Sequence, residues 1–143
     1  MLAARVIPCL LLKDQGLVKT VRFNKPRYVG DPINAVRIFN EKEVDELIFL
    51  DITATTENRK PNFQLISDIA GESFMPFSYG GGIRDLEDVE KLFTLGVEKI
   101  ILNSVVNTNP EFIRTVSSLY GSQSVVVSMD IKKNFFGQYE RYF

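Results

Sequence analysis

The stretch PFSYGGGIRDLEDVEKLFTLGVEKIILNS, residues 76–104, contains one complete structural unit. Apolar runs at 76–80 and 99–104 predict two buried strands. Between them, Asp85 is a suitable helix N-cap, apolar residues follow at helical spacing, and Gly96 fits the position after a helix. A strand, a helix and a second strand in this order predict parallel strands joined by a right-handed crossover.

The same alternation extends through the rest of the chain. Three more apolar runs predict strands at residues 5–12, 46–52 and 124–131, and three amphipathic patterns predict helices within residues 30–44, 63–70 and 109–121. An α/β protein of this kind is either a doubly wound open sheet or a (β/α)8 TIM barrel. A dinucleotide-binding open sheet would carry G-x-G-x-x-G after its first strand, where this chain has LLKDQGLVKTVRF, so the sequence favours the barrel.

The length limits how much of a barrel the chain can form. A whole barrel typically needs about 250 residues, and the chain has 143. We therefore expect residues 1–143 to form a single domain, the N-terminal half of a (β/α)8 barrel, with about four βα units and the fifth strand but without the C-terminal half. Residues 17–29 predict a β-ribbon or flap, and the last residues, KKNFFGQYERYF, predict the start of another hairpin.

The composition excludes several classes of function. With 45% apolar residues, 24% charged residues and a net charge of −1, the sequence predicts a globular cytoplasmic domain that binds neither nucleic acid nor membrane. Cys9 is the only cysteine, so no internal disulfide forms, and no signal peptide or membrane span is predicted. Because histidine is absent, acid–base chemistry falls to Asp, Glu, Lys or Tyr, and we expect no metal site and no cofactor.

Polar residues follow the predicted strands at the ends where parallel α/β folds bind ligands. Gly81 and Gly82 either present backbone N–H groups to a phosphate or form a plain tight turn. Asn103 and Ser104 either complete the same phosphate site or cap the next helix. These residues are therefore candidate phosphate ligands.

Three further residues are candidates for chemistry at the same ends of the strands. Asp130 is either a general acid–base or a loop-capping group, and its place at a strand end favours catalysis. Asp51 has the same placement after its strand, with a supporting role as the alternative. Lys19 lies in the flap, where it is either a surface lysine or a group that closes over the site.

Three charged residues begin predicted strands, at the opposite ends. Arg5, Glu46 and Lys99 would meet at the floor of a barrel. On chemical grounds alone they predict a structural cluster of ion pairs, because buried charges need partners to offset their desolvation.

Taken together, these residues resemble a known family, the cyclase subunit of imidazole glycerol phosphate synthase, a (β/α)8 barrel of histidine biosynthesis. The likeness covers the whole chain in one register and is carried by MLAARVIPCL, DELIFLDITA, PFSYGGGIRD, GVEKIILNS and GSQSVVVSMDIK. It implies that a glutaminase docked at the floor makes ammonia, which crosses the barrel and reacts with a ribulosyl nucleotide that carries a phosphate at each end.

The resemblance also implies roles for individual residues. Gly82, Asn103 and Ser104 match one phosphate site, with Gly81 beside them. Asp130 matches one of two catalytic aspartates, Lys19 the lysine of a mobile loop, Asp51 an acid at the site, and Arg5, Glu46 and Lys99 three members of a charged gate at the ammonia entrance.

One position departs from the family. The second catalytic aspartate falls on Leu11, which cannot take or give a proton. This pattern resembles paralogues of bacterial surface-polysaccharide pathways, such as lipopolysaccharide synthesis, which are thought to deliver ammonia for the amidation of a sugar. We favour that function, with a histidine-pathway cyclase and a non-catalytic phosphate-binding half-barrel as alternatives. The exposed fifth strand also predicts self-association of the half-barrel.

Overall fold

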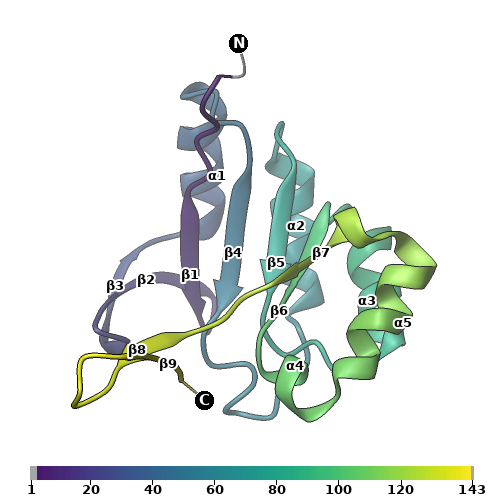
Figure 1. Ribbon diagram of the computed structural model, residues 1–143. Coiled ribbons are helices and arrows are strands. Elements are labelled where there is room, and N and C mark those ends of the chain that lie inside the picture. The colour runs from purple at the N-terminus through teal and green to yellow at the C-terminus, as the bar shows by residue number, and fades with distance from the viewer. Residues whose placement is uncertain (1–2, 143) are drawn as a thin grey trace.

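Five neighbouring strands of the main sheet run parallel in the computed structural model, which describes residues 3–142 (Figure 1). The sheet has the strand order β3-β2-β1-β4-β5-β6-β7, and a separate hairpin pairs β8 with β9. The strands are β1 (Cys9–Lys13), β2 (Gly16–Val21), β3 (Asn24–Gly30), β4 (Leu47–Asp51), β5 (Phe77–Gly80), β6 (Lys99–Leu102), β7 (Val125–Val127), β8 (Ile131–Lys133) and β9 (Tyr139–Arg141). The helices are α1 (Pro32–Glu41), α2 (Phe63–Glu72), α3 (Leu86–Thr94), α4 (Ser104–Thr108) and α5 (Pro110–Tyr120), followed by a 3₁₀ turn, η1 (Ser122–Ser124).

Helices α1, α2, α3 and α5 all lie on one face of the sheet (Figure 1). Each of the first three begins at a side-chain cap, in which Asp31, Asn62 and Asp85 accept a hydrogen bond from a backbone N–H in the first turn. The apolar stripes of the helices pack against alternate residues of the strands, so that Phe49 and Ile100 are completely buried. This helix-covered face contains the hydrophobic core.

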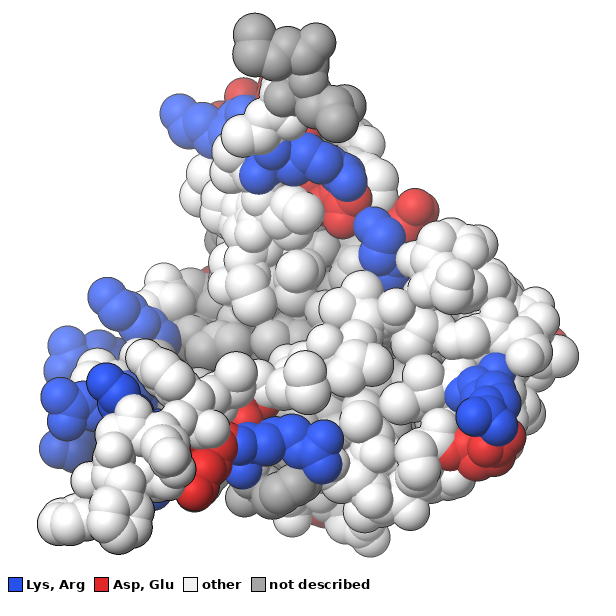
Figure 2. Space-filling model, in the orientation of Figure 1, with Lys and Arg blue, Asp and Glu red and all other residues white. Residues whose placement is uncertain are grey.

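The other face of the parallel strands, which we call the open face, is covered by no helix within residues 3–142 (Figure 1). Strand register places side chains of neighbouring strands side by side on this face. One row contains Cys9, Ile48, Ser78 and Lys99, and the next contains Leu11, Leu50, Gly80, Ile101 and Val126. Figure 2 shows the same side of the molecule as largely uncharged over its middle. In a closed barrel this face would form the interior.

The architecture confirms the predicted fold class, because five parallel strands with helices on one face form half of a barrel. The ribbon predicted at 17–29 is confirmed as β2 and β3. The terminal hairpin is confirmed as β8 and β9. Within residues 3–142, no helix combines the length and the apolar character that crossing a membrane requires.

Three predicted strand boundaries are wrong. The first strand begins at Cys9 and not at residue 5, because Pro8 has no N–H to donate to a ladder. The predicted strand 99–104 ends at Leu102, because Ser104 already begins α4. The predicted strand 124–131 ends at Val127, because the chain leaves the sheet there and Ile131 pairs instead with β9.

The open face and the edge strand β7 predict that the 143-residue chain associates with itself. Val126 lies on the open face with 39% of its surface exposed, and β7 has a neighbour on one side only within the described sheet. Sedimentation velocity should therefore show species heavier than 16.3 kDa. Val126→Lys should shift the distribution to the monomer, because it places a charge on this face.

Leu119→Lys is the matched control, since Leu119 is 62% exposed in α5, a helix of the opposite, helix-covered face. It should leave the association unchanged. A monomer of 16.3 kDa as the sole species of the unsubstituted chain would contradict the prediction.

Candidate functional site

The parallel strands place the predicted site residues at two opposite edges of the sheet. We call the edge where β4, β5, β6 and β7 end the mouth, and the edge where they begin the floor (Figure 1). Ligands of parallel α/β proteins bind at the ends of strands, so the mouth is the candidate binding site.

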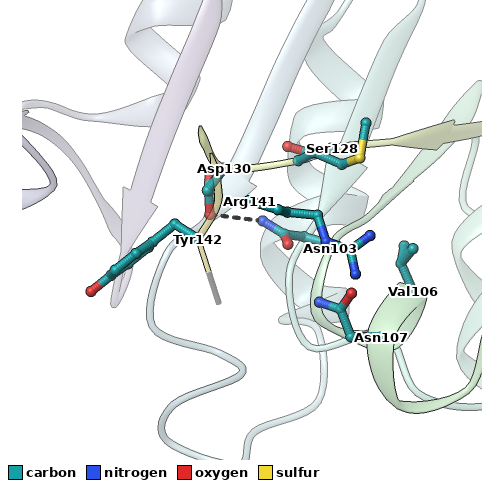
Figure 3. A pocket seen from close by; sticks show the side chains of 8 residues that line it. Asn103, Val106, Asn107, Ser128, Asp130, Arg141 and Tyr142 are labelled. Carbon is teal, nitrogen blue, oxygen red and sulfur yellow. Dashed lines mark hydrogen bonds between the residues drawn. The ribbon is translucent and has the colours of Figure 1, made fainter. Parts of the chain in front are cut away.

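Asn103 and Asp130 meet at the mouth. The Nδ2 of Asn103 donates a hydrogen bond of 3.0 Å to Oδ2 of Asp130 (Figure 3). Asn103 makes no side-chain cap of α4, so the capping alternative for this residue is not realised. Within residues 3–142 the contact orients the carboxylate of Asp130 and leaves its other oxygen for a proton or a ligand.

A shallow polar pocket surrounds this pair (Figure 3). The hairpin β8–β9 folds back toward the mouth, where Tyr142 N–H donates a 2.7 Å hydrogen bond to the backbone oxygen of Asp130. The pocket is lined by Asn103, Val106, Asn107, Ser128, Met129, Asp130, Arg141 and Tyr142. Sequence reasoning missed Asn107, Arg141 and Tyr142, because no local pattern indicates that the hairpin returns to the end of β7.

The glycine turn after β5 is a site of close backbone packing. Gly81 and Gly82 have φ of 121° and 71°, where residues with a Cβ are strained. A Cβ at Gly82 would lie 2.6 Å from the carbonyl oxygen of Arg59, and Gly82 N–H donates a 3.4 Å hydrogen bond to Oγ1 of Thr55. The glycines therefore allow the loop after β4 to pack against the turn. A phosphate role for them stays a prediction.

Asp51 is engaged by its own loop. Its Oδ1 accepts hydrogen bonds from the backbone N–H groups of Thr53 and Ala54 at 3.1 and 3.0 Å, and Arg59 contacts both carboxylate oxygens at 3.4 Å. The residue is 6% exposed. These contacts fit the supporting role that was the alternative for Asp51. They hold in place the loop that packs on Gly82.

Tyr79 lies behind the mouth on the helix-covered face, with its side chain buried. Its ring is 1% exposed, and burial together with the charge of Asp51 raises the pKa of the phenol well above its ordinary value. Nearby, the buried carboxylate of Asp88 pairs with Lys60 at 3.0 Å, and this bond raises the pKa of Lys60.

Leu11 lies on the open face near the mouth. Its direct cross-strand neighbours are Val18 in β2 and Leu50 in β4, so the position is flanked by apolar side chains. Lys19 lies on β2, and Leu11 and Lys19 line one hollow of about 280 Å³ beside the ribbon. Within residues 3–142 no hydrogen bond or ion pair joins Lys19 to Asp130, so the structure does not bring these two candidates together.

The three charged candidates meet at the floor, as the sequence predicted from their place at the starts of strands. Both carboxylate oxygens of Glu46 accept hydrogen bonds of 3.1 Å from Lys99 Nζ, and Arg5 donates to Oε1. Glu46 is 5% exposed. Burial opposes its ionisation, but the hydrogen bonds from Lys99 and Arg5 outweigh burial and hold the pKa of Glu46 below its ordinary value.

The chain matches one protein family over nearly its whole length. Residues 5–141 match the family described as histidine biosynthesis protein. A provisionally named imidazole glycerol phosphate synthase subunit hisF2 of Pseudomonas aeruginosa is 61% identical over 96% of this chain and 55% of its own length. A provisionally named subunit hisF3 of Vibrio vulnificus is 52% identical over 96% of this chain and 53% of its own length.

A relative with an unqualified name is less similar. The imidazole glycerol phosphate synthase subunit HisF of Streptococcus mutans is 44% identical over 93% of this chain and 53% of its own length. The chain thus spans about half the length of the curated relatives it matches.

The glycine turn generates a stability prediction. Gly82→Ala should lower the free energy of unfolding by about 1–3 kcal/mol, because the new Cβ meets a backbone oxygen at an unfavourable φ. Gly71→Ala is the control, since Gly71 lies in α2 with no atom within 4 Å of an added Cβ. The control should raise stability by about 0.4–1 kcal/mol. Chemical denaturation measures both, and equal effects would contradict the packing role.

The floor cluster generates a prediction on pH. Because its pKa is lowered in the folded protein, Glu46 contributes stability that is present above its ordinary value of 4.5 and is lost as the pH falls through the lowered pKa. Glu46→Gln should reduce the free energy of unfolding at pH 7 by about 1–3 kcal/mol, since it leaves Lys99 and Arg5 without their counterion. The difference from the unsubstituted protein should shrink on acidification.

Glu111→Gln is the control for this measurement. Glu111 pairs with Arg114 at 3.5 Å on the surface, and such pairs are worth about 0–1 kcal/mol. If the Glu46 variant and this control had the same stability at every pH, the structural role of the floor cluster would be refuted.

Proposed function

Because the chain belongs to the histidine biosynthesis protein family, of the HisF-like type, we propose that it is the N-terminal half of a barrel that conducts ammonia. In this proposal a glutaminase docks at the floor and hydrolyses glutamine. The ammonia passes along the interior to the mouth, where an acceptor that carries a phosphate binds.

The chemistry of the two edges supports this direction of transfer. At the floor, one segment of the sheet edge carries three charged side chains, Arg5, Glu46 and Lys99. In this proposal the glutaminase contacts these side chains and separates their ion pairs. Above this segment the open face carries Leu11, Leu50 and Ile101 in one row. An apolar passage favours neutral ammonia, because ammonium would lose its hydration there without compensation.

The mouth would hold a phosphate and an acid–base group. We assign Gly81, Gly82, Asn103 and Ser104 to phosphate binding, with Asp51 supporting the turn from below. Backbone N–H groups of a glycine turn and a neighbouring amide are suitable donors to a phosphate. Asp130, oriented by Asn103, would transfer protons, and Lys19 would close over the acceptor from the ribbon.

The choice of reaction rests on the presence of a leucine at position 11. Closing an imidazole ring requires several proton transfers, and general acid–base groups typically contribute about 10²–10⁴-fold each. Leu11 cannot transfer a proton, and its neighbours Val18 and Leu50 supply no titratable group in its place. We therefore propose that the ammonia is used for amidation of a sugar in bacterial surface-polysaccharide synthesis.

The names of the relatives agree with a separate branch of the family. Those at 52% to 61% identity carry provisional names, two of them numbered hisF2 and hisF3, whereas those at 40% to 44% are named without qualification. A histidine-pathway cyclase is the second candidate, favoured by the retention of Asp130 and Lys19. A phosphate-binding half-barrel without catalysis is the third.

The test uses the full-length protein bound to its glutaminase. With ammonia and the ribulosyl nucleotide, turnover should be far below the range of about 1–10³ s⁻¹ typical of enzymes. Leu11→Asp should raise this turnover by about 10²-fold or more, because it restores a carboxyl at the mouth. Asp130→Asn in the Leu11→Asp background should abolish the gain.

Cys9→Asp is the matched control. It places a carboxyl on the same strand and face, one row closer to the floor, and should give no gain in turnover. Cyclisation by the unsubstituted protein at ordinary enzyme rates would refute the amidation proposal and favour the cyclase.

A further inference from the structure

The ribbon formed by β2 and β3, residues 16–30, carries a local excess of positive charge. The chain as a whole has 17 Lys and Arg against 18 Asp and Glu, but residues 13–30 contain five of the cations and one of the acids. The cations are Lys13, Lys19, Arg22, Lys25 and Arg27, and the acid is Asp14. Figure 2 shows Lys and Arg side chains gathered at the side of the molecule where β2 and β3 lie.

The ribbon does not neutralise this charge internally. Lys19 and Arg27 are direct cross-strand partners in the antiparallel register, an arrangement of like charges that destabilises a sheet. Within residues 3–142, none of the five cations forms an ion pair. An anionic group from outside residues 3–142 would relieve this repulsion.

The ribbon also exposes large apolar side chains. Phe23 is 84% exposed and Tyr28 is 67% exposed, and Val21 and Val29 are exposed beside them. A small anion would neutralise the cations but would leave the aromatic rings in water. Arginine, tyrosine and phenylalanine together are typical of protein–protein interfaces, so these side chains favour a protein partner.

The ribbon stands at the mouth. β2 pairs with the end of β1, with Val18 opposite Leu11, and Lys19 lines the same hollow as Leu11. The hairpin β8–β9 begins directly after Asp130, whose side chain contacts Asn103 at the mouth, and it adds Phe135 and Phe136 with 98% and 85% of their surfaces exposed. Two hairpins with exposed aromatic rings thus project where ammonia would leave the barrel.

We propose that the β2–β3 ribbon is the docking surface for an acidic face of the sugar amidotransferase, which brings the acceptor to the mouth, an inference that rests on the proposed function. Ammonia released into water at neutral pH is mostly protonated and ceases to be a nucleophile. Transfer therefore requires that the accepting enzyme cover the mouth. A basic rim steers an acidic partner to this edge and orients it, while the exposed rings supply the apolar contact.

The test compares two variants of the full-length protein, bound to its glutaminase, with the same change in net charge. Arg22→Glu with Lys25→Glu reverses two cations of the ribbon. Lys91→Glu with Arg114→Glu is the control, because both residues lie on exposed helix surfaces away from the mouth and the floor, in α3 and α5. The partner in the test is the sugar amidotransferase of the proposed function.

The ribbon variant should bind this amidotransferase about tenfold more weakly or worse in sedimentation and calorimetry, with the difference falling as salt is added. Amidation from glutamine should fall in parallel. Amidation from added ammonium chloride, and glutamine hydrolysis by the glutaminase at the floor, should be unchanged. The control variant should match the unsubstituted protein in every assay.

Equal affinities for the ribbon variant and the control would overturn the docking surface. The docking surface would also be overturned if Arg22→Glu with Lys25→Glu weakened the binding of inorganic pyrophosphate or of phosphatidylglycerol vesicles but left the binding of the amidotransferase unchanged. If the unsubstituted protein gives no glutamine-dependent amidation, the proposed function itself fails. If it does and the ribbon variant performs equally well, only the docking inference fails.

Discussion

The alternation of side chains along the parallel strands determines where everything else in this chain lies. Leu12, Phe49 and Tyr79 face the helices and are almost fully buried, so the core forms on that side alone. The residues between them, such as Leu11 and Leu50, face the opposite side. One period-two pattern therefore produces both a packed core and an apolar surface that only a further part of a barrel, or a second copy, would cover.

Much of this arrangement could be predicted from the sequence. The order of strands and helices followed from apolar runs and from caps such as Asp31 and Asp85, which the structure places as expected. The meeting of Arg5, Glu46 and Lys99 followed from their shared position at the starts of strands. These features are local patterns in the sequence or direct consequences of parallel topology. They can therefore be predicted without knowing which distant loops are in contact.

The mouth was less accessible to prediction, because its contacts are made between distant loops. The engagement of Asp51 by Arg59 depends on the path of the loop after β4. The return of Tyr142 to Asp130 depends on the chain leaving the sheet after Val127. The family resemblance supplied candidate roles for these positions, but the contacts reveal that Asp51 holds a loop, and that Asn103 orients Asp130 in place of capping α4.

Leu11 connects the fold to the proposed function. It lies in a row of apolar side chains on the open face. In the proposed function this leucine extends a passage for ammonia and leaves no carboxyl there for ring closure. The most direct measurement supplies glutamine with isotope-labelled amide nitrogen to the full-length protein, its glutaminase and the sugar amidotransferase, with the ribulosyl nucleotide also present. The account predicts that the label appears in the amidated sugar. Label in an imidazole ring would contradict it.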